Sequence, residues 1–242
     1  MALLLSNRVK IFLDKYDLTV GGLDATLAAI KEAKDKTSIN DLYVANKLGA
    51  VGSSEFNYSA LFDDAATSNF LGLKALVGSD TERVLSVHLG TTKGDQAGLT
   101  LVKVLGIKTA AKHADLLPVS GEFAPHAVVE WGRVLYPKTT ITNTTAGTSI
   151  DFTTPGLTAL TWAYHVIAWS AVGGNAQWNL AIQESSDNAV GDPFADVESV
   201  NVTATGAARR TVTGARERYL KFKATRDATS GSLTVAIFVK LV

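Results

Sequence analysis

Residues 233–241 read Leu-Thr-Val-Ala-Ile-Phe-Val-Lys-Leu, and this stretch decides the fold class. Large aliphatic side chains occupy every second position, and threonine, alanine, phenylalanine and lysine stand between them. A period of two places alternate side chains on opposite faces of an extended chain, and β-branched residues favour that conformation. The stretch therefore predicts a β-strand with one buried face.

The same alternation recurs across the rest of the chain. It is clearest at residues 9–13, 178–183 and 219–225. Further strand-like runs occupy residues 83–89, 98–109, 127–135, 157–170 and 197–205. Many short strands with one apolar face are typical of antiparallel β-sandwiches. We therefore expect a mainly β protein.

Two segments have helical character. The run that opens at Asp63 and Asp64 carries Phe70, Leu73 and Leu76 at helical spacing, and acids suit a helix N-terminus. Residues 23–34 are rich in alanine, leucine, lysine and glutamate, which have high helix propensity.

A domain boundary is expected near Tyr136-Pro137-Lys138, because residues 139–149 are rich in threonine, glycine and asparagine. The sequence then predicts one β-sandwich over residues 1–136, a linker over 137–149 and a second β-sandwich over 150–242.

Composition excludes several protein classes. Of the 242 residues, 46% are hydrophobic and 19% charged, which argues against disorder. The formal net charge is zero, whereas nucleic-acid binders usually carry a basic excess. The chain has no cysteine, so it forms no disulfide. We expect no signal peptide and no membrane helix, and therefore a product made in a cytoplasm.

The chain offers little catalytic chemistry. His88, His113, His126 and His165 stand in no metal-ligand spacing, and no Gly-x-Ser-x-Gly motif is present. A calcium loop around Asp187-Asn188 remains an alternative, but it lacks the spacing of an EF-hand. We assign no catalytic residue, metal or cofactor and expect a non-enzymatic protein.

Charge is segregated in the C-terminal half. The acidic block holds five acids and no base between them: Glu184, Asp187, Asp192, Asp196 and Glu198. The basic block holds seven bases against Glu217: Arg209, Arg210, Arg216, Arg218, Lys221, Lys223 and Arg226. Opposed patches suit head-to-tail self-association, but a patch pair inside one subunit is an equal alternative.

Three tryptophans fall close together in the C-terminal half: Trp162, Trp169 and Trp178. Strand positions favour core roles, although a carbohydrate-binding sandwich would display such rings. Trp162 and Trp169 are seven residues apart, so on a regular strand they face opposite sides.

A series of short motifs resembles the major tail proteins, or tail tube proteins, of long-tailed siphovirus-type bacteriophages. The N-terminal motifs are Tyr16-Asp17-Leu18-Thr19, Gly21-Gly22-Leu23 and residues 52–63, Gly-Ser-Ser-Glu-Phe-Asn-Tyr-Ser-Ala-Leu-Phe-Asp. The later motifs are Gly94-Asp95-Gln96-Ala97-Gly98, a turn at residues 118–124, and residues 134–139, 180–188 and 232–239. The likeness spans nearly the whole chain and rests on motif order and spacing.

The resemblance implies a tail-tube-like sandwich with one flanking helix, followed by the second sandwich. It also implies a strand rather than a helix at residues 23–34, since tertiary context overrides propensity. Residues 34–52 then form a long loop that reaches the adjacent ring.

The resemblance further implies that the chain assembles with itself into stacked rings, either hexamers or pseudo-hexameric trimers. Other tail proteins at the tube ends and a tape-measure protein are the implied partners, and viral DNA passes through without specific binding. The implied location is the virion tail, assembled in the host bacterial cytoplasm. Candidate assembly residues, from the loop and the charge blocks, are Lys34, Lys36, Asn40, Asp41, Tyr43, Lys47, Glu184, Asp187, Asp192, Asp196, Glu198, Arg209, Arg210, Arg216 and Arg218. A virion-decorating or host-attachment sandwich that binds carbohydrate is the alternative.

Overall fold

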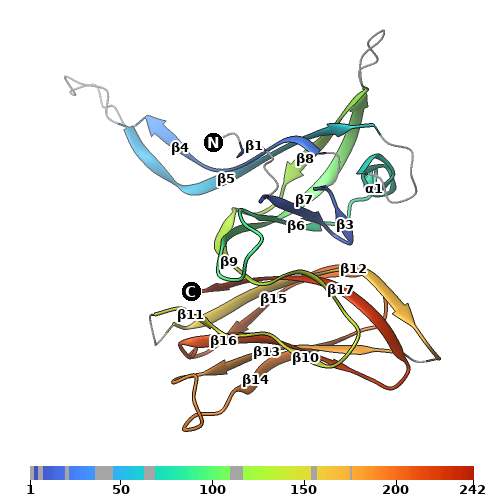
Figure 1. Cartoon of the computed structure of the whole chain (residues 1–242). Coiled ribbons are helices and arrows are strands. Elements are labelled where there is room, and N and C mark those ends of the chain that lie inside the picture. The colour runs from blue at the N-terminus through green and yellow to red at the C-terminus, as the bar shows by residue number, and fades with distance from the viewer. Residues whose placement is uncertain are drawn as a thin grey trace. The chain divides into compact units, whose positions relative to one another are not determined.

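The computed structural model describes residues 3–4, 8–19, 22–35, 46–62, 69–109, 117–153, 157–174 and 176–242. The protein is mainly β, its strands pair antiparallel, and one helix is present among the described residues, as predicted (Figure 1). The chain divides into two units, each built from several segments. Unit 1 comprises Met1–Ser6, Gly21–Arg83 and Thr100–Val129, and unit 2 comprises Asn7–Val20, Val84–Leu99 and Glu130–Val242.

Unit 1 is a sheet with a flanking helix. Its strands follow the order β1 (Leu3–Leu4), β4 (Gly22–Asp35), β5 (Asn46–Leu61), β8 (Pro118–Pro125) and the later part of β7 (Gln96–Thr109). Helix α1 spans Asn69–Leu76. The expected acidic start at Asp63 and Asp64 lies outside the described residues.

Packing in unit 1 joins the helix to the sheet. Leu73 is fully buried, and a Cβ placed on Gly121 of β8 would lie 3.5 Å from its side chain. Phe56 packs edge-on against Phe123 at 4.7 Å between ring centroids. The helix ends before Gly78, whose φ of 78° is the left-handed conformation common after a helix C-terminus.

Unit 2 contains a β-sandwich. One sheet has the order β9 (Glu130–Ile141), β17 (Ser230–Leu241), β12 (Ala159–Ala171) and β15 (Gly206–Thr213). The other has the order β10 (Thr145–Ala146), β16 (Tyr219–Arg226), β13 (Trp178–Ser185) and β14 (Ala195–Val202), and β11 (Ile150–Asp151) pairs with β16. Three further strands belong to unit 2 wholly or mostly: β2 (Lys10–Leu13), β3 (Tyr16–Asp17) and β6 (Arg83–His88).

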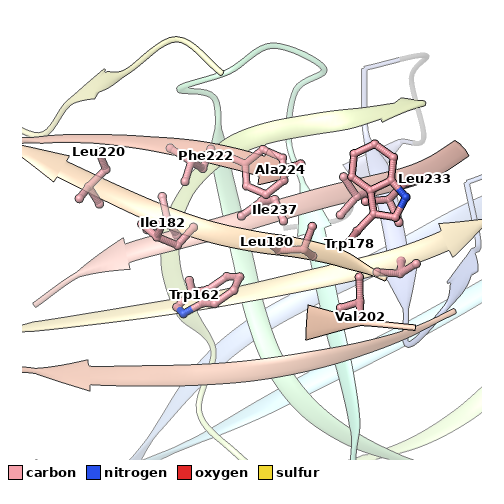
Figure 2. Close-up of a cluster of buried hydrophobic side chains, with 14 of the residues drawn as sticks. Trp162, Trp178, Leu180, Ile182, Val202, Leu220, Phe222, Ala224, Leu233 and Ile237 are labelled. Atoms are coloured by element: carbon pink, nitrogen blue, oxygen red, sulfur yellow. The ribbon is translucent and has the colours of Figure 1, made fainter. Parts of the chain in front are cut away.

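The two sheets of the sandwich enclose one hydrophobic core (Figure 2). Alternate residues of β12 and β17 point toward alternate residues of β13 and β16, and fully buried members include Trp162, Trp178, Leu180, Phe222 and Ile237. Strand β17 supplies Leu233, Val235, Ile237 and Val239 to this core, which confirms the apolar face predicted for residues 233–241. The prediction of only one buried face is wrong, because Thr234, Ala236 and Phe238 on the other face are buried as well.

Residues 23–34 form a strand. This agrees with the family resemblance and contradicts the helix that local propensity favoured. They belong to β4, which pairs with β5 along most of its length. The expected long loop over residues 34–52 is corrected in turn, because Lys34 pairs with Lys47 and Lys31 with Gly52. Both ends of that segment are therefore parts of a β-ribbon.

The expected linker at residues 137–149 also needs correction. Strand β9 continues through Pro137 to Ile141 and pairs with β17. The pairing shifts register between Val235 and Ile237, so Pro137 falls at an irregularity, where the missing N–H breaks no regular ladder bond. The units consequently do not divide at residue 136.

Two other segments differ from expectation. Residues 118–124, expected as a turn, lie in β8, whose prolines occupy its first and last positions, where they are tolerated. Residues 206–213, where the sequence predicted no strand, form β15 at the edge of the sandwich and carry Arg209 and Arg210 of the basic block.

Candidate assembly surfaces

The most distinctive surface of unit 1 is the β4–β5 ribbon. Strand β4 has 14 residues and β5 has 16, yet β1 pairs only with Asp24 and Ala25 of β4. Strand β8 pairs only with residues 58–61 of β5. Among the described residues, the ribbon over residues 26–35 and 46–57 therefore has no strand on either outer edge.

This ribbon is poorly suited to stand alone. A two-stranded hairpin is marginally stable in water, and an unpaired edge is a template for pairing with another chain. Its first strand reads Gly-Leu-Asp-Ala-Thr-Leu-Ala-Ala-Ile-Lys-Glu-Ala-Lys-Asp, and alanine, lysine and glutamate are depleted in natural strands. Local propensity therefore does not explain why β4 is a strand. Pairing of its free edge with a further strand would stabilise this conformation.

Six of the candidate assembly residues came from the loop expected at residues 34–52, and four of these six cannot be placed on the ribbon. Lys36, Asn40, Asp41 and Tyr43 lie outside the described residues. The backbones of Lys34 and Lys47 are paired with each other near the end of the described ribbon.

The charge blocks of unit 2 largely pair with carboxylates of the same unit. Arg210 Nη1 donates to Glu198 Oε1 at 2.9 Å, and Arg216 Nη1 lies 3.6 Å from Glu184 Oε2. Glu198 Oε2 also accepts the indole N–H of Trp162 at 2.6 Å. These contacts match the alternative of a patch pair inside one subunit.

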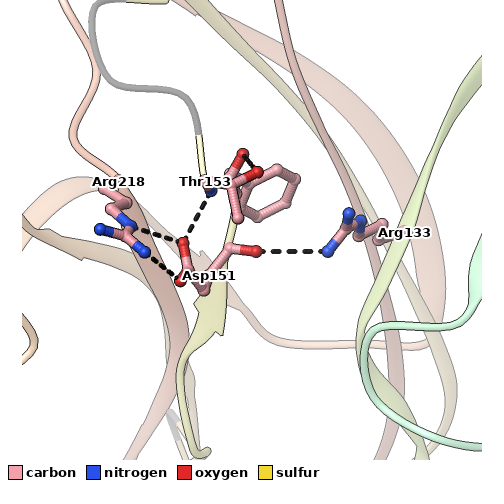
Figure 3. Close-up of polar contacts among 5 residues, drawn as sticks. Arg133, Asp151, Thr153 and Arg218 are labelled. Atoms are coloured by element: carbon pink, nitrogen blue, oxygen red, sulfur yellow. Dashed lines mark hydrogen bonds and ion pairs between the residues drawn. The ribbon is translucent and has the colours of Figure 1, made fainter.

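The other two candidate arginines bind acids outside the acidic block. Arg209 donates twice to Glu130, at 3.1 and 2.7 Å. Arg218 forms a two-pronged contact with Asp151, with Nε–Oδ1 and Nη2–Oδ2 distances of 2.7 and 2.6 Å (Figure 3). This contact holds the pKa of Asp151 below its usual value. Sequence analysis missed Glu130 and Asp151, because neither lies in a charge run.

The remaining acids organise the loop after β13. Asp187 Oδ1 accepts the backbone N–H of Ala189 at 2.8 Å, and Asp192 Oδ2 accepts that of Ser186 at 2.6 Å. Asp196 Oδ1 accepts Gln183 Nε2 at 2.6 Å. These bonds give the acids a local structural role.

The Glu217 carboxylate lies in an unfavourable electrostatic environment close to two acids of the acidic block. Burial, and then repulsion from Asp192 and Glu184, raise the pKa of Glu217, and Arg216 only partly offsets them. A raised carboxyl pKa means that the ionised form is disfavoured in the folded chain.

The three tryptophans that the sequence analysis considered, Trp162, Trp169 and Trp178, take core positions. Trp162 and Trp178 are fully buried, and Trp169 packs against the same core. The expectation that Trp162 and Trp169 face opposite sides is wrong, because the pairing of β12 with β17 shifts register between Val166 and Ala168. An added residue on one strand reverses the alternation beyond it and returns Trp169 to the core face.

Two histidines form a buried polar cluster in unit 2. His165 Nδ1 donates to the carbonyl of Asp14 at 2.7 Å, so the neutral ring accepts the Ser86 hydroxyl at Nε2, at 2.8 Å. Burial lowers the pKa of His165 to about 4. Burial, and then repulsion from His165, lower the pKa of His88 to about 3. Phe12 packs against both rings.

This cluster resembles a nucleophile–base pair only in composition. Ser86, His88 and His165 are all at most 1% exposed, so no substrate reaches them. The part of the chain that the structure describes contains no group of three side chains able to hold a metal ion. Nor does any helix within that part have the length and apolarity to cross a membrane.

Comparison with known proteins gives no family assignment. No protein-family model matches the chain, and no curated protein matches it. One matching solved structure is the SPP1 Dit protein, described as a paradigm of the hub adsorption apparatus in phages that infect Gram-positive hosts. It is 13% identical over 97% of this chain and 99% of that chain, with a TM-score of 0.37. A TM-score of this size does not establish a common fold and assigns nothing to this chain.

Proposed function

We propose that this chain is a non-enzymatic structural subunit of a phage tail, and that its copies assemble into stacked rings that form the tail tube. The observation that carries the proposal is the β4–β5 ribbon, whose outer edges have no paired strand among the described residues. The ordered tail-protein motifs of the sequence support the phage context.

The ribbon supports self-assembly because edge pairing is a general route to closed β-structures. When neighbouring subunits add their ribbons side by side, every outer N–H and C=O gains a partner, and closure into a ring leaves no free edge. Three or six copies satisfy this requirement equally well. In this role the subunit needs no metal, cofactor or catalytic group, and its location is the virion tail.

The formal charge of zero suits a conduit for DNA. A strongly basic lumen would bind phosphates and retard the passage of DNA, whereas a neutral tube would not. Within this proposal the partners are other copies of the chain, the proteins at the tube ends and the tape-measure protein, and DNA passes without specific binding.

A shortened ribbon provides the test. Ile30 and Ser53 are opposite each other in register, so residues 31–52 can be replaced by Asn-Gly, which favours two-residue hairpin turns. Negative-stain microscopy and sedimentation velocity should detect rings or tubes of the full chain and single subunits of the shortened chain. Far-UV circular dichroism should show that both remain folded.

The matched control is Val190→Ala in the sandwich, where the side chain is 96% exposed. This variant should assemble like the parent chain. Tubes of the shortened chain at the parental yield would overturn the proposal, as would a parent chain that stays monomeric at high concentration and neutral pH.

The carbohydrate-binding alternative loses its original support. It required displayed rings, but Trp162 and Trp178 are buried and Trp169 packs on the core.

A further inference from the structure

Unit 2 contains a hollow of about 380 Å³ that none of the assembly contacts uses. Its lining comes from β7, β9, β17 and the residue after β11, and includes Gln96, Trp131, Arg133, Phe152, Lys240 and Leu241. Small-molecule sites usually occupy concave surfaces of this size, with aromatic walls and a few polar groups.

Trp131 is the displayed tryptophan of this lining. Its side chain is 46% exposed, whereas Trp162 and Trp178 are fully buried. The residue opposite Trp131 on β7 is Gly98, which has no side chain to cover the indole.

The strand that carries Trp131 is held firmly. A Cβ on the next residue, Gly132, would lie 2.3 Å from the carbonyl oxygen of Val239, so β9 and β17 approach closely there. The indole therefore projects from a fixed backbone.

Arg133 is the cation whose side chain lies on the same face of β9 as Trp131, two residues away. The Lys240 side chain lies on the opposite face, because a Cβ on Gly132 would lie 3.0 Å from the Lys240 Cβ. Arg133 stacks over the Phe152 ring at 5.3 Å, and Nη1 donates to the backbone carbonyl of Asp151 at 3.3 Å. The carboxylate of Asp151 is bound by Arg218 instead (Figure 3). Among the described residues Arg133 forms no ion pair, unlike Arg209, Arg210, Arg216 and Arg218, although its charge contributes to the lowered pKa of Asp151.

We propose that this hollow binds an acidic saccharide, with the apolar face of a sugar ring on Trp131 and the sugar carboxylate on Arg133. An indole offers a large apolar surface with a polar edge, and a guanidinium matches a carboxylate through paired N–H donors. Gln96 at the rim supplies an amide donor and acceptor for sugar hydroxyls.

The same features argue against a nucleic acid as the ligand. Nucleic-acid sites line a backbone track with many basic groups, whereas this hollow presents one cation beside Trp131 on a chain with no net charge. A single charged ring fits the hollow better than a phosphodiester chain.

Isothermal titration calorimetry on the full chain tests the proposal. The probe is a tetrasaccharide that alternates glucuronate and N-acetylglucosamine, and the comparison ligands are cellotetraose, inorganic phosphate and tetrathymidylate. The acidic tetrasaccharide should bind at least about tenfold more tightly than each comparison ligand. Trp131→Ala and Arg133→Met should each weaken its binding by about tenfold.

The matched control is Lys108→Met, which removes the same charge from a lysine that pairs with Glu122 in unit 1. It should leave the affinity unchanged, and thermal unfolding should establish that all three variants are folded. Undetectable binding, an unchanged affinity in Trp131→Ala, or equal affinity for tetrathymidylate would overturn the proposal. The titration does not depend on ring formation, so sedimentation of the same samples separates its failure from failure of the tube proposal.

Discussion

The β-sandwich of unit 2 and the β4–β5 ribbon of unit 1 use the same antiparallel pairing to different ends. In the sandwich, β12, β13, β16 and β17 each have a strand on both sides and face a common core. In the ribbon, residues 26–35 and 46–57 pair only with each other among the described residues. The sandwich is therefore stabilised within the subunit, and the unpaired edges of the ribbon are the reason why we propose that it pairs with another copy of the chain.

Several charged side chains of the sandwich are also satisfied within the subunit. The sandwich arginines at 209, 210, 216 and 218 have carboxylate partners inside unit 2. Because these charges are already compensated, we place the assembly role on the backbone edges of the ribbon rather than on the charge blocks.

Hydrogen exchange should give the largest contrast between the two regions. In dissociated subunits, backbone amides of residues 26–35 should exchange at least about a thousandfold faster than those of β13 and β17, because local opening of the ribbon exposes no core. Exchange followed by mass spectrometry measures this ratio. Equal protection of the two regions in dissociated subunits would show that the ribbon is stable without a partner. Protection of the ribbon amides on assembly would show that its edges pair between subunits.

Acid should act on unit 2 next most strongly. His88 and His165 have folded pKa values of about 3 and about 4, below the ordinary value of 6.5. Between pH 6.5 and about 4 the unfolded chain binds protons that the folded chain excludes, so stability is complete above pH 6.5 and falls as pH falls. The two rings together should lower the free energy of unfolding by roughly 5 kcal/mol between pH 7.5 and 4.5.

Urea unfolding at several pH values measures this loss. His88→Leu removes one of the two titrations and should reduce the histidine-dependent loss by about half. The control is His126→Gln in unit 1, where the His126 side chain is exposed and lies 2.8 Å from Glu82. A pH profile unchanged by His88→Leu would contradict the assignment.

Truncation of the sandwich core should have a slightly smaller effect. Phe222 is fully buried between the sheets, so Phe222→Ala should lower the free energy of unfolding by about 3–5 kcal/mol. Val190→Ala at an exposed loop position should change it by less than about 0.5 kcal/mol. Denaturant unfolding monitored by tryptophan fluorescence separates the two, and equal losses would mean that the sandwich does not carry the stability.

Sequence patterns predicted regular strands well and irregular ones poorly. The alternation of residues 233–241 identified β17 and its core face, because period two is set by local backbone geometry. The register shift in β12 was invisible to this pattern, so the sequence placed Trp162 and Trp169 on opposite faces. Pro137 likewise suggested a boundary, although an irregularity in the β9–β17 pairing accommodates it.

For the surface residues, too, the sequence revealed some features and missed others. Sequence analysis found both charge blocks but not Glu130 and Asp151, the carboxylates that bind Arg209 and Arg218. It noticed three tryptophans that are core residues and passed over Trp131, since exposure depends on which residues other strands bring alongside. The signal available for Trp131 was its place between the polar Glu130 and Gly132 inside the strand-like run 127–135.

The residues alone predicted a mainly β chain with a buried aromatic core, because side-chain periodicity and β-branched residues mark buried strands. The single flanking helix and the strand at residues 23–34 followed from the family resemblance, since local propensity favoured a helix at residues 23–34. The tertiary structure was needed to show that residues 34–35 and 46–52 lie in paired strands rather than in a loop, that arginines of the basic block bind carboxylates of the same unit, and that the ribbon has no strand on its outer edges among the described residues. Those features depend on pairing between segments far apart in the chain, and backbone hydrogen bonds between strands carry no sequence signature of their partner.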